Sequence, residues 1–134
     1  MKTVKVIDSS SLVKYFSREE DWKKVEEEIL KGTISLDLSI KEVANALWKK
    51  ALNKETRLED AEEIVRDLIK SETIKIENQD AYLPAALRSA VKNRITVYDS
   101  LFIELARSAK TDLVTSDRTQ AEAARKEGIE TKII

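Results

Sequence analysis

Residues 3–16 read TVKVIDSSSLVKYF, and this stretch decides the fold. Its first part, 3–8, is a short run of mostly β-branched apolar residues that ends on Asp8, which is typical of a buried strand. Its second part, 10–16, has the apolar spacing of a short helix. A strand that leads directly into a helix is the first half of the unit from which parallel sheets are built.

The same alternation continues to the end of the chain. Further strands are predicted at 33–37, 73–77, 112–116 and 130–134. Helical periodicity is clearest in 39–53, 57–70 and 98–109, and shorter helices are predicted at 19–31, 80–92 and 118–127. Strands separated by crossovers of a dozen or more residues predict an α/β fold, with a parallel sheet and helices on both faces. Ligands of such sheets bind beyond the carboxyl ends of the strands, where the strand order reverses.

Several residues mark the expected helix ends. Pro84 falls early in its helix, where a missing N–H does least harm, and Gly128 follows the last helix as a C-terminal cap. Ser39 with Glu42 three residues later has the pattern of a capping box. Trp22 and Trp48 lie on apolar stripes, which predicts a place in the core or in a dimer interface.

Length and composition indicate one globular domain that spans residues 1–134. The formal net charge of −1 is not typical of a nucleic-acid-binding protein, whose footprint is usually a basic excess. A bound metal ion and a local basic stripe could serve the same purpose. Composition therefore does not exclude a nucleic-acid substrate.

The chain contains no His and no Cys. This absence excludes a Ser-His-Asp triad, a Cys nucleophile, an ordinary zinc site and a disulfide. The N-terminal stretch lacks the long apolar region of a signal peptide, and nothing approaches the ~20 apolar residues of a membrane span. We therefore expect a cytoplasmic protein without a membrane partner.

Four acidic residues are placed where this fold would gather them at one end of the sheet. Asp8 closes the first predicted strand and Asp117 closes the strand at 112–116, while Glu42 and Asp99 lie near the starts of two helices. Carboxylates held close together repel one another unless a cation lies among them, and hard oxygen ligands suit Mg²⁺ or Mn²⁺. The pattern indicates a metal-dependent enzyme.

Two of these acids have an alternative explanation. Glu42 could be the acidic member of the capping box, although Asn45 three residues later suits a group that orients a metal ligand. Asp99 could be a carboxylate that complements the dipole at a helix start. The residues alone leave both alternatives open.

Other polar residues lie close to the predicted site. The hydroxyls of Thr115 and Ser116 could bind a metal-held water or a phosphate, or could only make hydrogen bonds at the strand end. Ser10 could face the site, and Asp37 ends another strand and is a reserve acid. The basic residues expected near the mouth of the site are Lys14, Arg94 and Arg118.

Four segments together resemble the motif blocks of a known family. They are VIDSSSLVKYF (6–16), EVANAL (42–47), YDSLFIELA (98–106) and LVTSD (113–117). In this order they resemble a PIN domain, and most closely the small VapC toxins of toxin–antitoxin pairs. The resemblance spans almost the whole chain.

The resemblance implies a three-layer α/β sandwich with a five-stranded parallel sheet of order 3-2-1-4-5, and a Mg²⁺- or Mn²⁺-dependent ribonuclease. The family's acids match Asp8, Glu42, Asp99 and Asp117, and its small polar residue near the last acid matches Thr115 or Ser116. Asp37 departs from the family's pattern, because relatives more often carry a small or apolar residue there.

The chemistry implied is hydrolysis of RNA that leaves a 5′-phosphate and a 3′-hydroxyl. Asp8, Asp99 and Asp117 would hold the metal directly or through water, and Glu42 would hold a water or a second metal. The family also implies a homodimer and a VapB-like antitoxin, whose Arg or Lys would lie among the carboxylates. An alternative is a PIN-like module that binds protein or RNA without catalysis, although the presence of all four acids argues against it.

Two other phosphoryl-transfer folds fit the residues poorly. A receiver domain needs paired acids after the first strand, where this chain has Ser9 after Asp8. A haloacid-type phosphatase needs Asp-x-Asp, and Ser10 occupies the third place.

Overall fold

The structure is a computed structural model that describes residues 4–134, so Thr3, the first residue of the first predicted strand, lies outside the described part. Its elements in chain order are β1 (Lys5–Ile7), α1 (Ser9–Phe16), α2 (Trp22–Leu30), β2 (Thr33–Leu36), α3 (Asp37–Leu52), α4 (Leu58–Lys70), β3 (Ile74–Glu77), the 3₁₀ helix η1 (Gln79–Tyr82), α5 (Leu83–Asn93), α6 (Val97–Ala109), β4 (Leu113–Thr115), α7 (Arg118–Lys126) and β5 (Thr131–Ile133).

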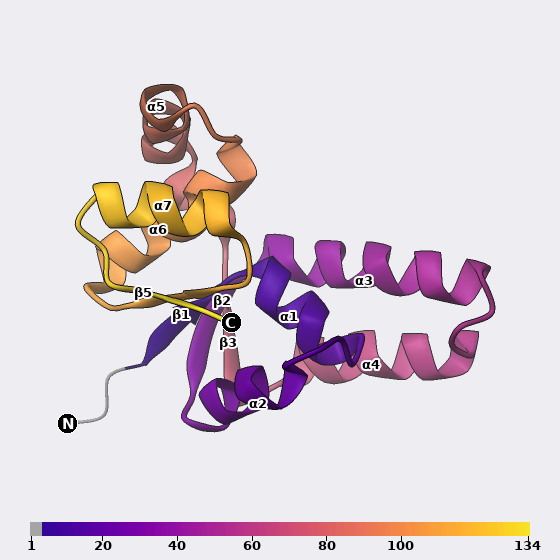
Figure 1. The fold of residues 1–134 in the computed structure, drawn as a ribbon. Coiled ribbons are helices and arrows are strands. Elements are labelled where there is room, and N and C mark those ends of the chain that lie inside the picture. The colour runs from indigo at the N-terminus through magenta and orange to yellow at the C-terminus, as the bar shows by residue number, and fades with distance from the viewer. Residues whose placement is uncertain (1–3) are drawn as a thin grey trace.

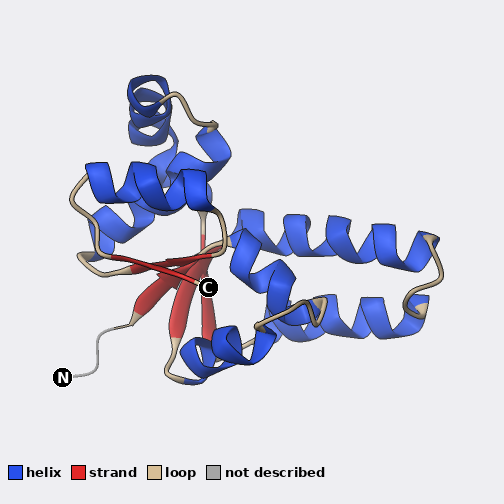
Figure 2. Ribbon diagram, viewed as in Figure 1, coloured by secondary structure: helices blue, strands red, loops and turns tan. Residues whose placement is uncertain are grey.

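The five strands form one sheet in the order β3-β2-β1-β4-β5, and every neighbouring pair is parallel (Figure 2). This arrangement confirms the α/β fold predicted from the sequence and the strand order implied by the resemblance. All five predicted strands are present, and within the described residues each is shorter by one or two residues than the apolar run that predicted it. The order reverses at β1, which lies between β2 and β4.

Successive strand residues point to opposite faces, which divides the core in two. Val6 of β1 and Leu113 of β4 belong to a cluster with Phe102 of α6 and with residues of α5 and α7. Their neighbours Ile7 and Val114 belong to a second cluster, with residues of α1, α2, α3 and α4. The sheet is therefore the middle of three layers, as Figure 1 shows.

The start of α3 differs from the sequence prediction. The helix begins at Asp37 after the extended residue Leu36, so Ser39 lies inside the first turn. Its hydroxyl is buried and donates to the Leu36 carbonyl at 2.7 Å, a bond that the predicted cap position would not allow. The capping-box interpretation of Ser39 and Glu42 is wrong, and the Glu42 carboxylate is left available for another contact.

Three other helix ends refine the predictions. The single helix predicted at 80–92 is divided into η1 and α5, with Pro84 in the first turn of α5. Helix α2 begins at Trp22, after the left-handed Asp21, and not at residue 19. Gly128 takes a left-handed φ of +80° after α7, and its N–H donates to the Arg125 carbonyl, which confirms the predicted cap.

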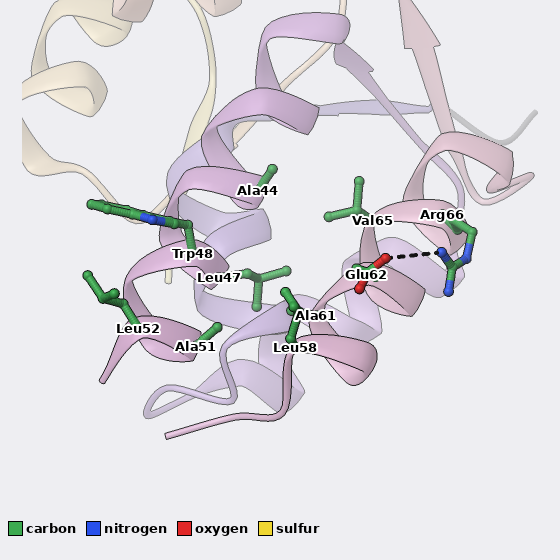
Figure 3. A pocket seen from close by; sticks show the side chains of 10 residues that line it. All are labelled: Ala44, Leu47, Trp48, Ala51, Leu52, Leu58, Ala61, Glu62, Val65 and Arg66. Atoms are coloured by element: carbon green, nitrogen blue, oxygen red, sulfur yellow. Dashed lines mark ion pairs between the residues drawn. The ribbon is translucent and has the colours of Figure 1, made fainter. Parts of the chain in front are cut away.

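Helices α3 and α4 extend past the sheet as an antiparallel pair, with an apolar groove between them (Figure 3). Trp48 and Leu52 of α3 and Leu58 of α4 line this groove, and Trp48 is 59% exposed. Trp48 is therefore not a core residue of this chain. Trp22 is half-buried, and the Arg18 guanidinium lies 4.1 Å from the centre of its ring. Within residues 4–134, no helix has the length and apolar character needed to cross a membrane.

A buried carboxylate joins α2 to both β1 and β5. The Glu28 side chain is 1% exposed, and it accepts hydrogen bonds from Lys132 at 2.8 Å and from Lys5 at 3.3 Å. Burial alone would raise the pKa of Glu28, but the hydrogen bonds and positive charges of Lys132 and Lys5 outweigh it and hold the pKa below its ordinary value. Glu28 therefore stabilises the folded state while it is ionised.

Replacing Glu28 by Gln should lower the free energy of unfolding at pH 7 by about 2 kcal/mol, because the variant loses charge-assisted hydrogen bonds inside the fold. A carboxylate with a lowered pKa contributes stability above its ordinary pKa, and that contribution is lost as the pH falls through the folded-state pKa. The deficit of the variant in urea unfolding should therefore shrink as the pH falls below 4.5, the ordinary value for glutamate. Glu27→Gln, at the exposed neighbouring position, is the matched control and should be neutral. An equal deficit at every pH would contradict the ionic role.

Candidate active site

A polar pocket of about 500 Å³ opens beyond the carboxyl ends of β1 and β4. All four acids singled out in the sequence line it. Its lining residues are Asp8, Ser9, Ser10, Val13, Lys14, Glu19, Glu42, Asp99, Phe102, Ser116 and Asp117. They come from the β1–α1 junction, α3, α6 and the β4–α7 junction, so the fold brings together segments more than a hundred residues apart.

Asp8 is the most buried of the four acids, with 3% exposure. It is the N-cap of α1, and its carboxylate accepts a hydrogen bond from the Ser11 N–H at 3.0 Å. The Ser10 hydroxyl lies 2.8 and 2.9 Å from its two oxygens, and the Thr115 hydroxyl lies 2.6 Å from Oδ2. Burial raises the pKa of Asp8 from 3.8 to about 6, even though these hydrogen bonds lower it; the nearby charge of Asp99 adds a smaller upward effect.

Glu42 faces the pocket from the second turn of α3. Its Oε1 accepts a hydrogen bond from the Ser9 hydroxyl at 2.9 Å. Burial raises the pKa of Glu42, and the bond from Ser9 lowers it by less. Glu42 does not cap its helix, so its carboxylate is free to contact Ser9. This hydrogen bond holds the Glu42 side chain at the pocket.

Asp99 and Asp117 complete the acidic lining from α6 and from the β4–α7 junction. The pKa of Asp99 is raised from 3.8 to about 6, first by burial and then by the charges of Asp117 and Glu42, while a hydrogen bond with Thr96 lowers it by less. Asp117 is the N-cap of α7, and its Oδ1 accepts the Gln120 N–H at 3.1 Å. Asp99 also lies in the first turn of α6, where a carboxylate complements the helix dipole. The two explanations considered for Asp99 are therefore compatible, because the same carboxylate also lines the pocket.

No basic side chain neutralises this group of acids. In the part of the chain that the structure describes, no ion pair involves Asp8, Glu42, Asp99 or Asp117. Among the described lining residues Lys14 alone carries a positive charge, and its Nζ donates to the Ile134 carbonyl at 2.7 Å. The four carboxylates therefore repel one another with no internal cation.

The donor set fits a hard divalent cation, because every polar side-chain atom of the four acids and of Ser9, Ser10 and Ser116 is an oxygen. As the side chains stand, no three acidic groups among residues 4–134 lie close enough together to hold a metal ion jointly. Mg²⁺ commonly binds one or two carboxylates and keeps several waters. The geometry thus suits a cation held partly through water better than one enclosed by three carboxylates.

The structure places the remaining predicted residues as follows. Ser116 lines the pocket, and Thr115 lies beneath it in contact with Asp8. Asn45 is exposed and lies outside the lining: it is offset from Glu42 by about 60° around the axis of α3, and this offset places it on the solvent side of the helix. Asp37 also lies outside, and its Oδ1 accepts the Gln79 N–H at 3.0 Å. Of the three basic residues expected near the mouth, Lys14 lines the pocket, whereas Arg94 and Arg118 do not.

Sequence reasoning missed two residues of the site. Ser9 was not among the residues predicted for the site, yet its hydroxyl donates to Glu42. Gln120 was not considered, although it is fully buried and contacts Thr115 and the Asp99 backbone. The spacing of Asp117 and Gln120 is that of an N-cap acid with a Gln three residues later, a signal that could have found it.

The sequence and the fold of this chain are similar to those of known proteins. Residues 5–126 match the family model of the PIN domain. The chain is 31% identical over 120 residues to "Ribonuclease VapC3" of Pyrobaculum aerophilum, an alignment covering 87% of this chain and 92% of that protein. It is 30% identical over 113 residues to "Exonuclease VapC9" of the same organism, covering 84% and 80%. The crystal structure of PAE2754 from Pyrobaculum aerophilum superimposes with a TM-score of 0.72 at 26% identity, over 98% of this chain and 85% of that one.

The raised pKa values predict how metal-free stability depends on pH. A carboxyl group whose pKa is raised by folding destabilises the folded state once the pH exceeds its ordinary pKa, and this loss grows until the folded-state value is passed. Between pH 4 and pH 6 the site should therefore lose stability as Asp99 ionises, given its pKa of about 6. Asp99→Asn should raise the free energy of unfolding in EDTA at pH 7 by about 1 kcal/mol, a value reduced from the full shift because Asp99 is only half-buried.

The measurement is thermal unfolding in EDTA from pH 4 to pH 7.5. The advantage of Asp99→Asn over the parent should grow between pH 4 and pH 6 and then level off, whereas Glu122→Gln, an exposed charge on α7, should show no such trend. A variant that melts below the parent throughout would show that the Asp99 charge is stabilising.

Proposed function

The chain belongs to the PIN-domain family, and on that premise we propose that it is a ribonuclease of the VapC type that depends on Mg²⁺ or Mn²⁺. The observation that carries the proposal is the convergence of four carboxylates on one pocket, where none of them forms an ion pair within residues 4–134. The curated relatives that carry the names ribonuclease and exonuclease match this chain over most of its length. We propose Asp8, Glu42, Asp99 and Asp117 as the catalytic residues.

The nucleophile in this proposal is water, because the chain has no His or Cys and no serine of the pocket is paired with a basic group. Asp8, Asp99 and Asp117 would hold a divalent cation, directly or through water. A cation bound there would supply a water of lowered pKa and positive charge for the negative charge that develops on the phosphate. Ser10, Ser11 and Thr115 fix the Asp8 carboxylate through the hydrogen bonds described above.

Glu42 has a separate part in this proposal. Its Oε1 is held by Ser9, while the carboxylate still borders the pocket. In that position it can orient a water and accept its proton. The raised pKa of Glu42 makes it a better proton acceptor than an ordinary surface glutamate.

The substrate in the proposal is a phosphodiester of RNA. A chain with net charge −1 has no general attraction for RNA, so the contacts with phosphate must be local. Lys14 at the pocket and the site's cation supply positive charge where the scissile phosphate would lie. The products would carry a 5′-phosphate and a 3′-hydroxyl.

The proposal predicts RNA cleavage that requires Mg²⁺ or Mn²⁺ and stops in excess EDTA. Asp8→Asn should reduce the rate at least a hundredfold, or about 2.7 kcal/mol of activation free energy, because it removes ligand charge with almost no change in shape. Asp37→Asn is the matched control: it changes an acid at the end of β2 that lies outside the pocket, and it keeps the oxygen that caps η1.

The assay follows a labelled RNA by gel electrophoresis, with circular dichroism to show that each variant is folded. If Asp8→Asn cleaves as fast as the parent, the assigned site is wrong. If the parent binds RNA in a filter assay but never cleaves it with either metal, the alternative of a non-catalytic binding module is correct.

We also propose a VapB-like antitoxin as a partner and a homodimer as the assembly. An Arg or Lys of the antitoxin would lie among the four carboxylates, where no basic side chain of this chain pairs with them within the described residues. The apolar groove between α3 and α4 (Figure 3) is lined from Ala44 onwards, so a partner helix lying in it would run along the same helix that carries Glu42. Exposed apolar surface of this kind marks protein-binding sites.

Competition between the antitoxin's cation and the metal gives a test. The protein encoded beside this chain should inhibit RNA cleavage, and replacing its C-terminal Arg and Lys residues by Gln should weaken inhibition at least tenfold. Trp48→Ser should weaken complex formation without changing cleavage by the chain alone. Inhibition that survives loss of every basic residue would contradict competition at the acids, and light scattering that gives 15.3 kDa at high concentration would contradict the homodimer.

A further inference from the structure

Gln120 connects three of the four acidic positions from inside the protein. It lies in α7 and is fully buried. Its Nε2 donates to the backbone carbonyl of Asp99 at 2.9 Å, and its Oε1 lies 2.8 Å from the Thr115 hydroxyl oxygen. Its backbone N–H donates to Asp117, and Thr115 in turn contacts Asp8.

The contact with Asp99 fixes which way the Gln120 amide faces. A carbonyl oxygen can only accept, so the amide must present its NH₂ group to it. The Oε1 atom must then face Thr115, because turning the amide over would set two carbonyl oxygens against each other. Gln120 is therefore an acceptor towards Thr115.

Thr115 has one hydroxyl proton and two close buried acceptors for it, whereas the Ser10 hydroxyl lies further away, at 3.3 Å. Its oxygen already accepts the Asp117 N–H at 3.0 Å, and it lies 2.6 Å from Asp8 Oδ2 and 2.8 Å from Gln120 Oε1. The shorter bond goes to the carboxylate, as a charge-assisted bond should. While Thr115 donates to Asp8, Gln120 Oε1 has no other donor among the described residues, since every other polar contact of Gln120 is made through nitrogen.

We propose that Gln120 is a positioning residue of this site, whose Oε1 accepts the hydrogen bond of the Thr115 hydroxyl when the Asp8 carboxylate is engaged by a divalent cation. An oxygen that shares its electron pairs with a cation is a weaker hydrogen-bond acceptor, whereas Gln120 Oε1 gains a bond it lacked. Rotation of one hydroxyl group thus compensates the change at Asp8. The inference rests on the proposed metal-dependent function and adds a residue that acts through Thr115.

The Gln120 side chain has a second role through its contact with the Asp99 backbone. By holding the first turn of α6 against α7, Gln120 sets the distance between the Asp99 and Asp117 carboxylates, which already repel each other. Loss of the amide should let the two acids separate. Loss of the hydrogen bond with Thr115 and loss of the contact with Asp99 should each weaken cation binding. Neither involves a group that touches the RNA.

The test measures Mn²⁺ affinity by isothermal titration calorimetry. Gln120→Met keeps a similar volume and removes both side-chain hydrogen bonds; it should weaken Mn²⁺ binding about tenfold, equivalent to about 1.4 kcal/mol. Gln79→Met, the same change at the other glutamine of the chain, should leave the affinity unchanged. In RNA cleavage at subsaturating metal, Gln120→Met should lower kcat and leave the KM for RNA within twofold.

A double-mutant cycle isolates the hydroxyl. In the Thr115→Val background there is no hydroxyl group that could turn from Asp8 to Gln120. Gln120→Met should therefore have a smaller effect on Mn²⁺ affinity there than in the parent. A purely structural role would instead lower the melting temperature in EDTA by the same amount in both backgrounds and leave the Mn²⁺ affinity unchanged.

The native chain offers a measurement that needs no Gln120 variant. With ¹⁵N-labelled glutamine only two side-chain amide groups give signals, those of Gln79 and Gln120. Titration with Mg²⁺ should shift the Gln120 amide signals, and at saturation the shift should be at least halved in Thr115→Val, while the Gln79 signals stay in place.

Equal shifts in the parent and in Thr115→Val, or equal Mn²⁺ affinity in the parent and in Gln120→Met, would overturn the role of Gln120 alone. If the parent binds neither Mn²⁺ nor Mg²⁺, the proposed function itself fails. The two failures are therefore distinguishable.

Discussion

The site depends on the parallel pairing of β1 with β4. Ile7 lies opposite Val114 in this pair, and the Asp8 N–H donates to the Val114 carbonyl at 3.1 Å. That register sets Asp8 next to Thr115 where both strands end. The chain then leaves β1 into α1 on one face of the sheet and leaves β4 into α7 on the other. The two helices diverge, and the pocket opens between them at the point where the strand order reverses.

Two buried carboxylates, those of Glu28 and Asp8, have pKa values shifted in opposite directions. Glu28 is surrounded by lysines, and its pKa is held below the ordinary value. Asp8 is equally buried, yet it has hydroxyls and one N–H as partners, and burial raises its pKa. The first arrangement stabilises the fold by itself. The second leaves a negative charge that an external cation would compensate, and this cost to stability is typical of functional sites.

Much of the fold could be predicted because its signals are local. Each β-branched run became a strand, and Asp8 and Asp117 were found because each directly follows one. Contacts between distant segments could not be predicted from these local signals. The hydroxyl of Ser39 bonds to Leu36, so a capping-box pattern did not become a capping box. Asn45 shares a helix with Glu42 but faces solvent. The spacing of Gln120 from Asp117 could have placed it at a helix start, but its contacts with residues on two other elements are visible only in the structure. Periodicity places a residue on an element, but it does not fix the partner of a side chain across the sheet.

The central claim is that the four acids form a cation site between β1, α3, α6 and the β4–α7 junction. The most direct measurement is anomalous scattering from Mn²⁺ in crystals grown with that ion. The account predicts a peak inside the pocket, with at least one carboxylate oxygen of Asp8, Asp99 or Asp117 at about 2.0–2.2 Å and the remaining ligands supplied largely by water. The absence of a peak in the pocket at saturating Mn²⁺, or peaks only at exposed surface acids, would contradict it.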